Sequence, residues 1–270
     1  MNQSKMFDQQ QGFIIPNWPA PENVRALVST RVSLNNDTSL SKKLNGYDHF
    51  NLALHVNDDP QQVLKKREQL AQYLEIPSTN IAWLDQVHGT DVVNTKHRIH
   101  KLIRADACTS TTPEDVCAIM TADCLPVLFC NVPDNKQAQQ VAAAHAGWRG
   151  LADGILSKTL AKFSQPESVI AWLGPAISQT HFEVGQEIYD AFVDKNSANK
   201  TAFISIPNTS IECPKWLASL TGLAKIELAN AGIKAIYGGE FCTYEQSELF
   251  YSYRRDGAQS GRMASLIMLI

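Results

Sequence analysis

The chain has 270 residues, 44% of them hydrophobic and 19% charged, and this composition excludes disordered, collagen-like and disulfide-stapled classes. The net charge is −3 and the basic residues are scattered, so we expect no nucleic-acid partner. No apolar run approaches the ~20 residues that span a bilayer, and the first residues lack the basic start and apolar stretch of a signal peptide, so we expect a cytoplasmic protein without a membrane partner.

The amino-terminal part of the chain predicts one strand, one long loop and one helix. The first dozen residues are polar and predict a frayed terminus before a first strand at residues 24–29. Residues 33–48 are polar and predict a mobile loop that could cover a site. Asp59 and Pro60 supply an N-cap and a first-turn proline, and apolar residues at helical spacing predict a helix that stops before Pro77.

The rest of the chain alternates strand-like and helical patterns. Short apolar runs at 116–120 and 127–130 predict two strands joined by a tight turn. A strand at 141–145, a glycine turn and a helix over 151–163 follow. Further strands are predicted at 169–173, 234–237 and 264–270, and further helices at 186–193 and 215–231. Strands alternating with helices favour an α/β fold, and no repeat or linker divides the chain, so one domain is expected.

Three segments concentrate residues that bind metals: Gln-Val-His-Gly-Thr-Asp, Thr-Ala-Asp-Cys-Leu-Pro and Ala-His-Ala-Gly-Trp-Arg-Gly. They place His88, Cys124 and His145 at predicted strand ends or turns, where α/β folds gather functional side chains. Two imidazoles and a thiolate suit zinc with one open position, which is the arrangement of a catalytic site. Copper(I) accepts the same donors.

The residues leave other interpretations open. The spacing of the three side chains matches no short metal motif, and isolated His and Cys are more often core or surface residues. Cys124 could instead be a nucleophile with His145 or His88 as its base.

Charged residues near these segments could have catalytic or anion-binding roles. Asp123 could act as an acid or base or simply cap a turn. Arg149, at a glycine turn that opens a helix, could hold an anion or form a surface salt bridge. The segment 252–262 has three arginines and two glycines and could bind phosphate or be solvated surface. No dinucleotide-binding or P-loop pattern is present.

Taken together and in order, the segments of the chain resemble the YfiH family. This family is also called laccase-like or multicopper polyphenol oxidase and, more recently, purine nucleoside phosphorylase, and its bacterial members include a peptidoglycan editing factor. Beside the three segments above, the resemblance rests on Ser-Thr-Arg (29–31), Asn-Leu-Ala-Leu-His-Val-Asn-Asp-Asp (51–59), Leu-Gly-Pro-Ala-Ile (173–177), Phe-Glu-Val-Gly (182–185), Cys-Thr (242–243), Ser-Tyr-Arg-Arg (252–255) and Gly-Arg (261–262).

The resemblance implies a fold. It predicts a single-domain three-layer α/β sandwich with a mixed sheet, related to the catalytic domain of cytotoxic necrotizing factor, over residues 24–270 behind an N-terminal extension at 1–23. It makes His88, Cys124 and His145 the expected zinc ligands, with copper as the alternative metal. The segment 131–140 is slightly long for the family, and we expect a surface hairpin to absorb it without moving the metal.

The resemblance also implies an activity on small molecules. It predicts phosphorolysis of adenosine, inosine and 5′-methylthioadenosine to free base and ribose 1-phosphate, with adenosine deamination as a second activity. Copper-dependent polyphenol oxidation, cysteine-dependent hydrolysis of peptidoglycan precursors and a binding role without turnover remain alternatives, and no obligate protein partner is inferred. The expected catalytic residues are Cys124 and Asp123, and the expected substrate-binding residues are Asn51, His55, Arg149 and Arg255.

Overall fold

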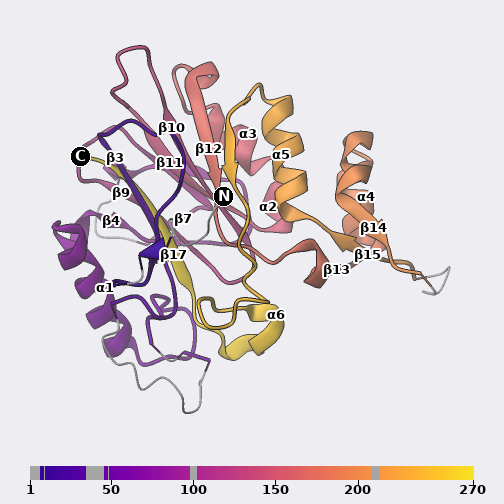
Figure 1. The fold of residues 1–270 in the computed structure, drawn as a ribbon, viewed down its shortest axis with the longest axis horizontal. Coiled ribbons are helices and arrows are strands. Elements are labelled where there is room, and N and C mark those ends of the chain that lie inside the picture. Colours follow the sequence, from indigo (N-terminus) through magenta and orange to yellow (C-terminus); the bar gives the residue numbers. More distant parts are fainter. Residues whose placement is uncertain (1–6, 9, 35–45, 48, 98–101, 208–212) are drawn as a thin grey trace.

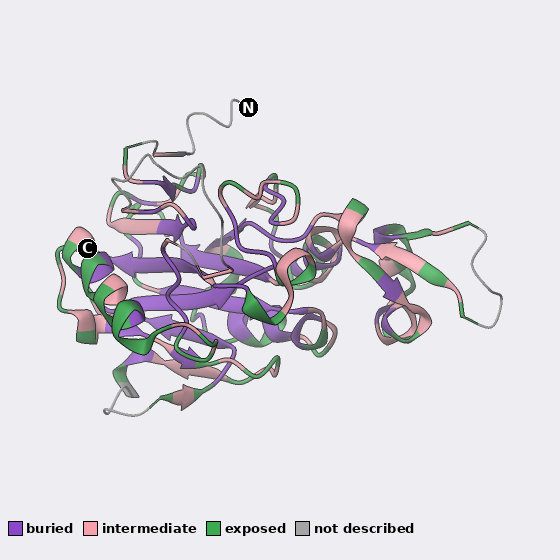
Figure 2. Ribbon diagram, turned by 90° about the horizontal axis from the view of Figure 1, so that it is seen from below, coloured by how far each residue is buried: buried purple, intermediate pink, exposed green. Residues whose placement is uncertain are grey.

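Two six-stranded sheets lie face to face between helices (Figures 1 and 2). The structure is a computed structural model that describes residues 7–8, 10–34, 46–47, 49–97, 102–207 and 213–270. The first sheet has the order β1 (Phe7–Asp8), β2 (Phe13–Ile14), β3 (Val24–Ser29), β17 (Met263–Leu269), β9 (Val116–Thr121) and β4 (Ile81–Ala82). The second has the order β16 (Ile236–Gly238), β12 (Val169–Leu173), β10 (Leu125–Asn131), β11 (Val141–Ala146), β8 (Ala107–Ser110) and β6 (Val92–Asn94).

Both sheets are mixed. The β4–β9 pair of the first sheet and the β12–β16 and β6–β8 pairs of the second are parallel, whereas their other pairs are antiparallel. The smaller elements are β5 (Leu84–Asp85) with β7 (Ile103–Arg104), and a sheet of β13 (Glu183–Gly185), β15 (Lys215–Ala218) and β14 (Phe203–Ser205). The helices are α1 (Pro60–Leu74), α2 (Trp148–Ala152), α3 (Ile155–Leu160), α4 (Gln186–Val193), α5 (Leu220–Asn230) and α6 (Tyr253–Asp256). The predicted mixed α/β sandwich is confirmed.

The layering follows from strands that are apolar on both faces. In β17, Leu266 packs in the cluster beneath α1, while Ile267 points between the sheets, because successive side chains of a strand alternate. In β10, Leu128 lies between the sheets and Phe129 faces α3 and α5. These alternations set the layers of the predicted sandwich. The order is helix, sheet, sheet, helices, because the apolar runs bury both faces of two separate sheets.

Several predicted elements are present with changed bounds. The two strands predicted around Cys124 are β9 and β10, but they belong to different sheets, so the turn between them crosses from one sheet to the other. The helix predicted over 151–163 is two short helices, because Gly154 takes a left-handed conformation (φ 84°) between them. The strand predicted at 234–237 is β16.

Other predictions need correction. Residues 215–218 form strand β15 and only Leu220–Asn230 is helical, because Ser219 caps α5 by accepting from the Gly222 amide. The sheet also begins before residue 24, since Phe13 and Ile14 are buried in β2 and pair with β3. The predicted loop over 33–48 lies largely outside the described residues.

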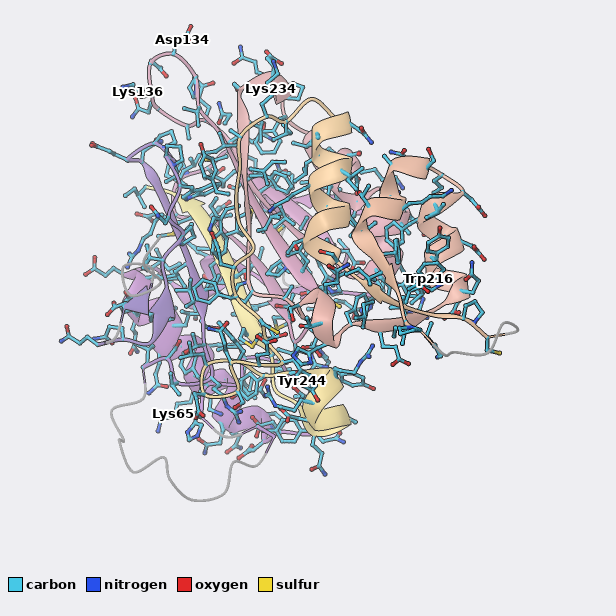
Figure 3. All side chains as sticks on the ribbon, turned by 45° about the vertical axis from the view of Figure 1, so that its right-hand side comes forward. Lys65, Asp134, Lys136, Trp216, Lys234 and Tyr244 are labelled. Carbon is cyan, nitrogen blue, oxygen red and sulfur yellow. The ribbon has the colours of Figure 1, made fainter. Side chains whose placement is uncertain are left out.

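The segment between residues 131 and 140 is a surface loop, as predicted. It joins β10 to β11, and the labelled Asp134 and Lys136 project from its tip in Figure 3. Because Pro126 pairs with His145 and Cys130 pairs with Val141, the loop closes the end of the hairpin opposite His145. Its extra length therefore leaves the predicted ligands in place. Within the described residues, the structure contains no helix of the length and apolarity needed to cross a membrane.

Candidate metal centre

The structure brings His88, Cys124 and His145 together at one end of the two sheets. Their ligand atoms all lie within 4.8 Å of one another, and the Cys124 Sγ to His88 Nε2 distance is 3.7 Å. His88 follows β5, Cys124 lies in the turn before β10, and His145 is in β11. The pairing of Pro126 with His145 places the β9–β10 turn beside the end of β11. Sheet register therefore joins two ligands that are far apart in sequence.

The donor set fits one metal ion. With Zn–S near 2.3 Å and Zn–N near 2.0 Å, a tetrahedral site separates S and N by about 3.5 Å, close to the 3.7 Å found for Cys124 and His88. His88 is exposed, Cys124 is half-buried and His145 is buried, so the ligands form a floor that is open on one side. Three ligands with an open side match a catalytic rather than a structural zinc site.

Gly147 leaves the space in which the three side chains meet. A Cβ atom at this position would lie 2.7 Å from His88 Cδ2, 3.1 Å from Cys124 Sγ and 3.4 Å from His145 Nε2. Any side chain at position 147 would therefore displace a ligand.

One buried carboxylate, that of Asp106, orients both histidines. Its Oδ1 atom accepts from the His88 amide at 2.9 Å and lies 2.8 Å from His145 Nδ1. Its Oδ2 atom accepts from the Val87 and Gly89 amides. These bonds hold His88 in a left-handed conformation (φ 60°) and leave His145 Nε2 for a metal. Burial raises the pKa of Asp106, but the bonds from His145 and the amides outweigh burial and lower it.

Without a metal, Cys124 and His145 favour a charged pair. Burial raises the pKa of the Cys124 thiol, but His145 and His88 outweigh burial and lower it to about 6. Burial lowers the pKa of His145, whereas Cys124 and Asp106 raise it to about 9. The thiolate is the form that binds a metal, so the surroundings prepare Cys124 as a ligand or as a nucleophile.

The three side chains line a cavity of about 460 Å³. This volume suits a small molecule. Its wall combines aromatic side chains with polar and cationic ones. The lining includes Trp148, Phe182, Tyr253, Met120, Ile177, Leu220, His55, Gln86, Asp123, Arg254 and Arg262.

Asp123 lies in the cavity wall beside Cys124 in a left-handed conformation (φ 87°). Its Oδ1 accepts from the Thr243 hydroxyl and its Oδ2 from the Arg254 amide, both at 2.6 Å. Both oxygens thus join the turn before β10 to the C-terminal segment. Asp123 thus caps its turn, as one of the two predicted roles has it, but its hydrogen-bond partners come from distant residues in the C-terminal part of the chain.

Of the predicted substrate-binding residues, the structure places His55 in the cavity wall but not the other three. Asn51 is fully buried, where its amide bonds Asp58 and Ala53 and its Oδ1 accepts from the Arg262 amide. Asn51 therefore supports the wall without lining it.

The two predicted phosphate-binding arginines also lie outside the cavity wall. The exposed Arg149 guanidinium stacks 4.4 Å from the ring centre of Trp148. Arg255 donates to the carbonyl oxygens of Thr243, Tyr244 and Phe250 and pairs with Asp256. Its donors are used within the protein, so its expected contact with substrate is corrected. Figure 3 shows Tyr244 close to α6, the element that carries Arg255.

Three functional candidates were missed by sequence reasoning. Arg254 and Arg262 belong to the arginine-rich segment that the sequence singled out, but composition could not tell which guanidinium faces the cavity. Asp106 lies between β7 and β8 without a recognisable motif. Only its carboxylate, buried in a site with two histidines, reveals its role.

Comparisons with known proteins agree along nearly the whole chain. Residues 34–270 match the family described as multi-copper polyphenol oxidoreductase laccase. A protein of Escherichia coli (strain K12) named "Purine nucleoside phosphorylase YfiH" is 45% identical over 258 residues, which cover 95% of this chain and 98% of that protein. A Haemophilus influenzae protein named "Purine nucleoside phosphorylase" is 43% identical over 94% of this chain and 98% of its own length.

Solved structures share the fold. A crystal structure of a Neisseria meningitidis protein has a TM-score of 0.85 and 43% identity, and the match covers 96% of this chain and 99% of that chain. The crystal structure of a Bacillus licheniformis hypothetical protein named YfiH has a TM-score of 0.78 and 26% identity, with 92% and 93% covered.

Proposed function

The chain belongs to the YfiH family, whose family model is described as multi-copper polyphenol oxidoreductase laccase, and we propose from this membership that it is a zinc-dependent purine nucleoside phosphorylase. The observation that carries the proposal is the cavity above His88, Cys124 and His145, which has aromatic and cationic walls. Relatives that match nearly the whole chain bear the name of this activity, which supports the assignment.

The reaction needs a purine, a ribose and a phosphate in one cavity. A phosphate oxygen forms a bond to C1′ of the ribose. The C1′–N9 bond breaks, and its electron pair goes to N9 of the purine. The purine leaves with a proton taken from the medium or a nearby donor. The products are ribose 1-phosphate and the free base. Catalysis then depends on aligning phosphate with C1′ and on stabilising the departing base.

The cavity residues divide these tasks by their chemistry. Trp148, Phe182 and Tyr253 offer aromatic faces against which a flat purine can pack. A zinc ion held by the three ligands would supply positive charge and Lewis acidity at the cavity floor. Asp123 has both oxygens in hydrogen bonds, so we assign it a positioning role toward Arg254 in place of acid–base chemistry.

The laccase description of the family fits this chain less well. A laccase uses several coppers and many histidine ligands, whereas the chain has 7 histidines. Among the described residues, one group of three metal-ligating side chains is found, that of His88, Cys124 and His145. One group can hold one metal, which favours zinc-assisted phosphorolysis over copper-dependent oxidation.

The deciding measurement is release of free base from adenosine, inosine and 5′-methylthioadenosine, with and without phosphate, by protein of known metal content. We expect phosphate-dependent release from zinc-loaded protein, with loss of at least about 100-fold in kcat in His88→Ala and Cys124→Ala. Ammonia release from adenosine, measured in parallel, would reveal deamination. Absence of base release from zinc-loaded protein would refute the proposal. Hydrolysis that survives zinc removal but needs Cys124 would replace it with the cysteine-hydrolase alternative.

A further inference from the structure

Two arginines in the cavity wall, Arg254 and Arg262, form no ion pair with a carboxylate among the residues that the structure describes. Arg262 donates from Nη1 to the carbonyl oxygens of Ser260 and Gly261. Arg254 donates from both Nη atoms to the carbonyl oxygen of Glu183. No carboxylate of the described residues forms an ion pair with either guanidinium. Both positive charges are thus held in place by neutral groups.

The neighbouring arginine shows the contrast. Arg255 is paired with Asp256 and donates to three carbonyl oxygens, so its charge and its donors are satisfied within the protein. Arg262 is half-buried, and its placement in the wall costs solvation free energy that no ion pair repays. A partly buried guanidinium that faces a cavity and forms no direct ion pair within the described residues is the side chain expected to bind an anionic ligand.

The support for Arg262 is built into the fold. Its backbone amide donates to Asn51 Oδ1 at 2.9 Å, and Asn51 is fully buried and anchored to Asp58. Its guanidinium lies 5.9 Å from the ring centre of Tyr253, the residue before Arg254. The buried Asn51 therefore fixes Arg262 in the same wall as Arg254.

His55 adds a hydrogen-bonding group to the cavity wall near Arg262. It lines the same space, and burial together with the charges of Arg262 and Arg67 lowers its pKa. A neutral imidazole can donate one hydrogen bond to an oxyanion without adding a charge. Asp85, Cys124 and Asp123 are the negative groups that face this side, and Asp123 is already bonded at both oxygens.

We propose that Arg262, with Arg254 and His55, binds the inorganic phosphate that attacks the nucleoside. The inference rests on the proposed phosphorylase function. A phosphate dianion offers several oxygens to the guanidinium groups, whereas a purine nucleoside carries no negative charge. The same subsite would hold the phosphoryl group of ribose 1-phosphate after the C1′–O bond has formed.

The test compares variants of zinc-loaded protein in two assays. One assay measures the KM for phosphate and the KM for nucleoside during base release, and the other measures binding of inorganic phosphate by calorimetry without nucleoside. In Arg262→Gln we expect the phosphate KM to rise about 10- to 100-fold while the nucleoside KM stays within about two-fold. Arg262→Lys keeps the charge but not the planar fork, so its phosphate KM should rise less.

Lys136→Gln is the control, because Lys136 is an exposed cation in the loop between β10 and β11, at the end of the hairpin opposite His145. We expect it to behave as the wild type. If Arg262→Gln does not fold, as judged by circular dichroism and zinc content, Arg254→Gln takes its place, since the Arg254 side chain is exposed and its two side-chain hydrogen bonds within the described residues go to one carbonyl oxygen, that of Glu183. It should raise the phosphate KM several-fold.

An unchanged phosphate KM in the folded arginine variants, or an equal rise in Lys136→Gln, would overturn the inference while leaving the phosphorylase function intact. If the wild type releases no base, the proposed function fails, and calorimetry still decides the subsite. Phosphate binding that is lost in Arg262→Gln would then support the anion site, and absence of binding to the wild type would overturn it.

Discussion

At the residue scale, the candidate metal centre depends on a carboxylate that does not line the cavity, that of Asp106. Asp106 receives three consecutive backbone amides and the Nδ1 side of His145. The His145 amide also donates to the Asp106 carbonyl oxygen at 2.7 Å. One buried residue thus sets the loop conformation of His88 and the tautomer of His145, in the way that second carboxylates support metal-binding histidines.

We therefore predict that Asp106→Asn weakens zinc binding by about 10- to 100-fold, because an amide cannot accept all four hydrogen bonds and neutralises the partner of His145. Competition with a chromogenic chelator measures the change. Asp134→Asn, in the exposed loop at the far end of the β10–β11 hairpin, is the control and should bind zinc as the wild type does. Equal affinity in Asp106→Asn and the wild type would show that His88 and His145 need no such support.

At the element scale, the short helix α3 receives its N-terminal cap from another helix. Its N-cap residue is Gly154, which has no side chain to accept a hydrogen bond. Instead Glu227 of α5 accepts from the Ser157 amide and hydroxyl, both at 2.9 Å. The Oε2 atom of Glu227 is buried without a partner among the described residues. Burial raises the pKa of Glu227 above its ordinary value of 4.5, although the bonds from Ser157 partly offset this.

This arrangement predicts a pH effect on stability. A carboxyl whose pKa is raised by folding binds its proton more tightly in the folded state, so its contribution to the free energy of unfolding falls as the pH rises through the folded-state pKa. Glu227→Gln removes that loss. We expect the variant to gain stability relative to the wild type as the pH rises above the ordinary glutamate pKa of 4.5, measured by urea unfolding at several pH values. The exposed Glu167→Gln should show no such trend. A constant difference for Glu227→Gln would contradict the prediction.

At the scale of the whole molecule, the metal centre connects parts of the chain that fold into both sheets. Cys124 lies in the turn that passes from β9 of the first sheet to β10 of the second, and His145 is in β11 of the second. His88 follows β5, outside both large sheets. A bound metal would therefore link three segments that are distant in sequence, and binding to the folded state alone stabilises that state.

We predict that removing zinc with a chelator lowers the midpoint of thermal unfolding by about 10 °C, since metal at a thousand times its Kd contributes about 4 kcal/mol. Differential scanning calorimetry measures the shift. In His88→Ala the chelator should have little effect, because a ligand is missing. A wild-type midpoint that does not respond to zinc removal would indicate that no metal binds at these three residues.

The sequence by itself determined much of the local structure and predicted the grouping of His88, Cys124 and His145. Helix α1 begins where Asp59 and Pro60 predict it, because the Asp59 side chain accepts from the Gln61 amide and Pro60 suits the first turn. The strands of the core are continuous apolar runs that can be recognised without a structure. His88, Cys124 and His145 stand in motifs whose order along the chain is specific to one family, so their grouping was predictable.

The tertiary structure alone decided which neighbours each residue meets. Residues 215–218 read as the start of a helix, but they pair with β13 and β14, and Trp216 stacks on Tyr189 at 4.1 Å, so long-range contacts override local propensity. The sequence pattern does not distinguish Arg254, Arg255 and Arg262. In the structure Arg255 bonds carbonyl oxygens and the Asp256 carboxylate, whereas Arg254 and Arg262 face the cavity. The roles of these arginines and of Asp106 depend on partners that come from distant segments, and a local sequence pattern does not show which distant residues will be neighbours.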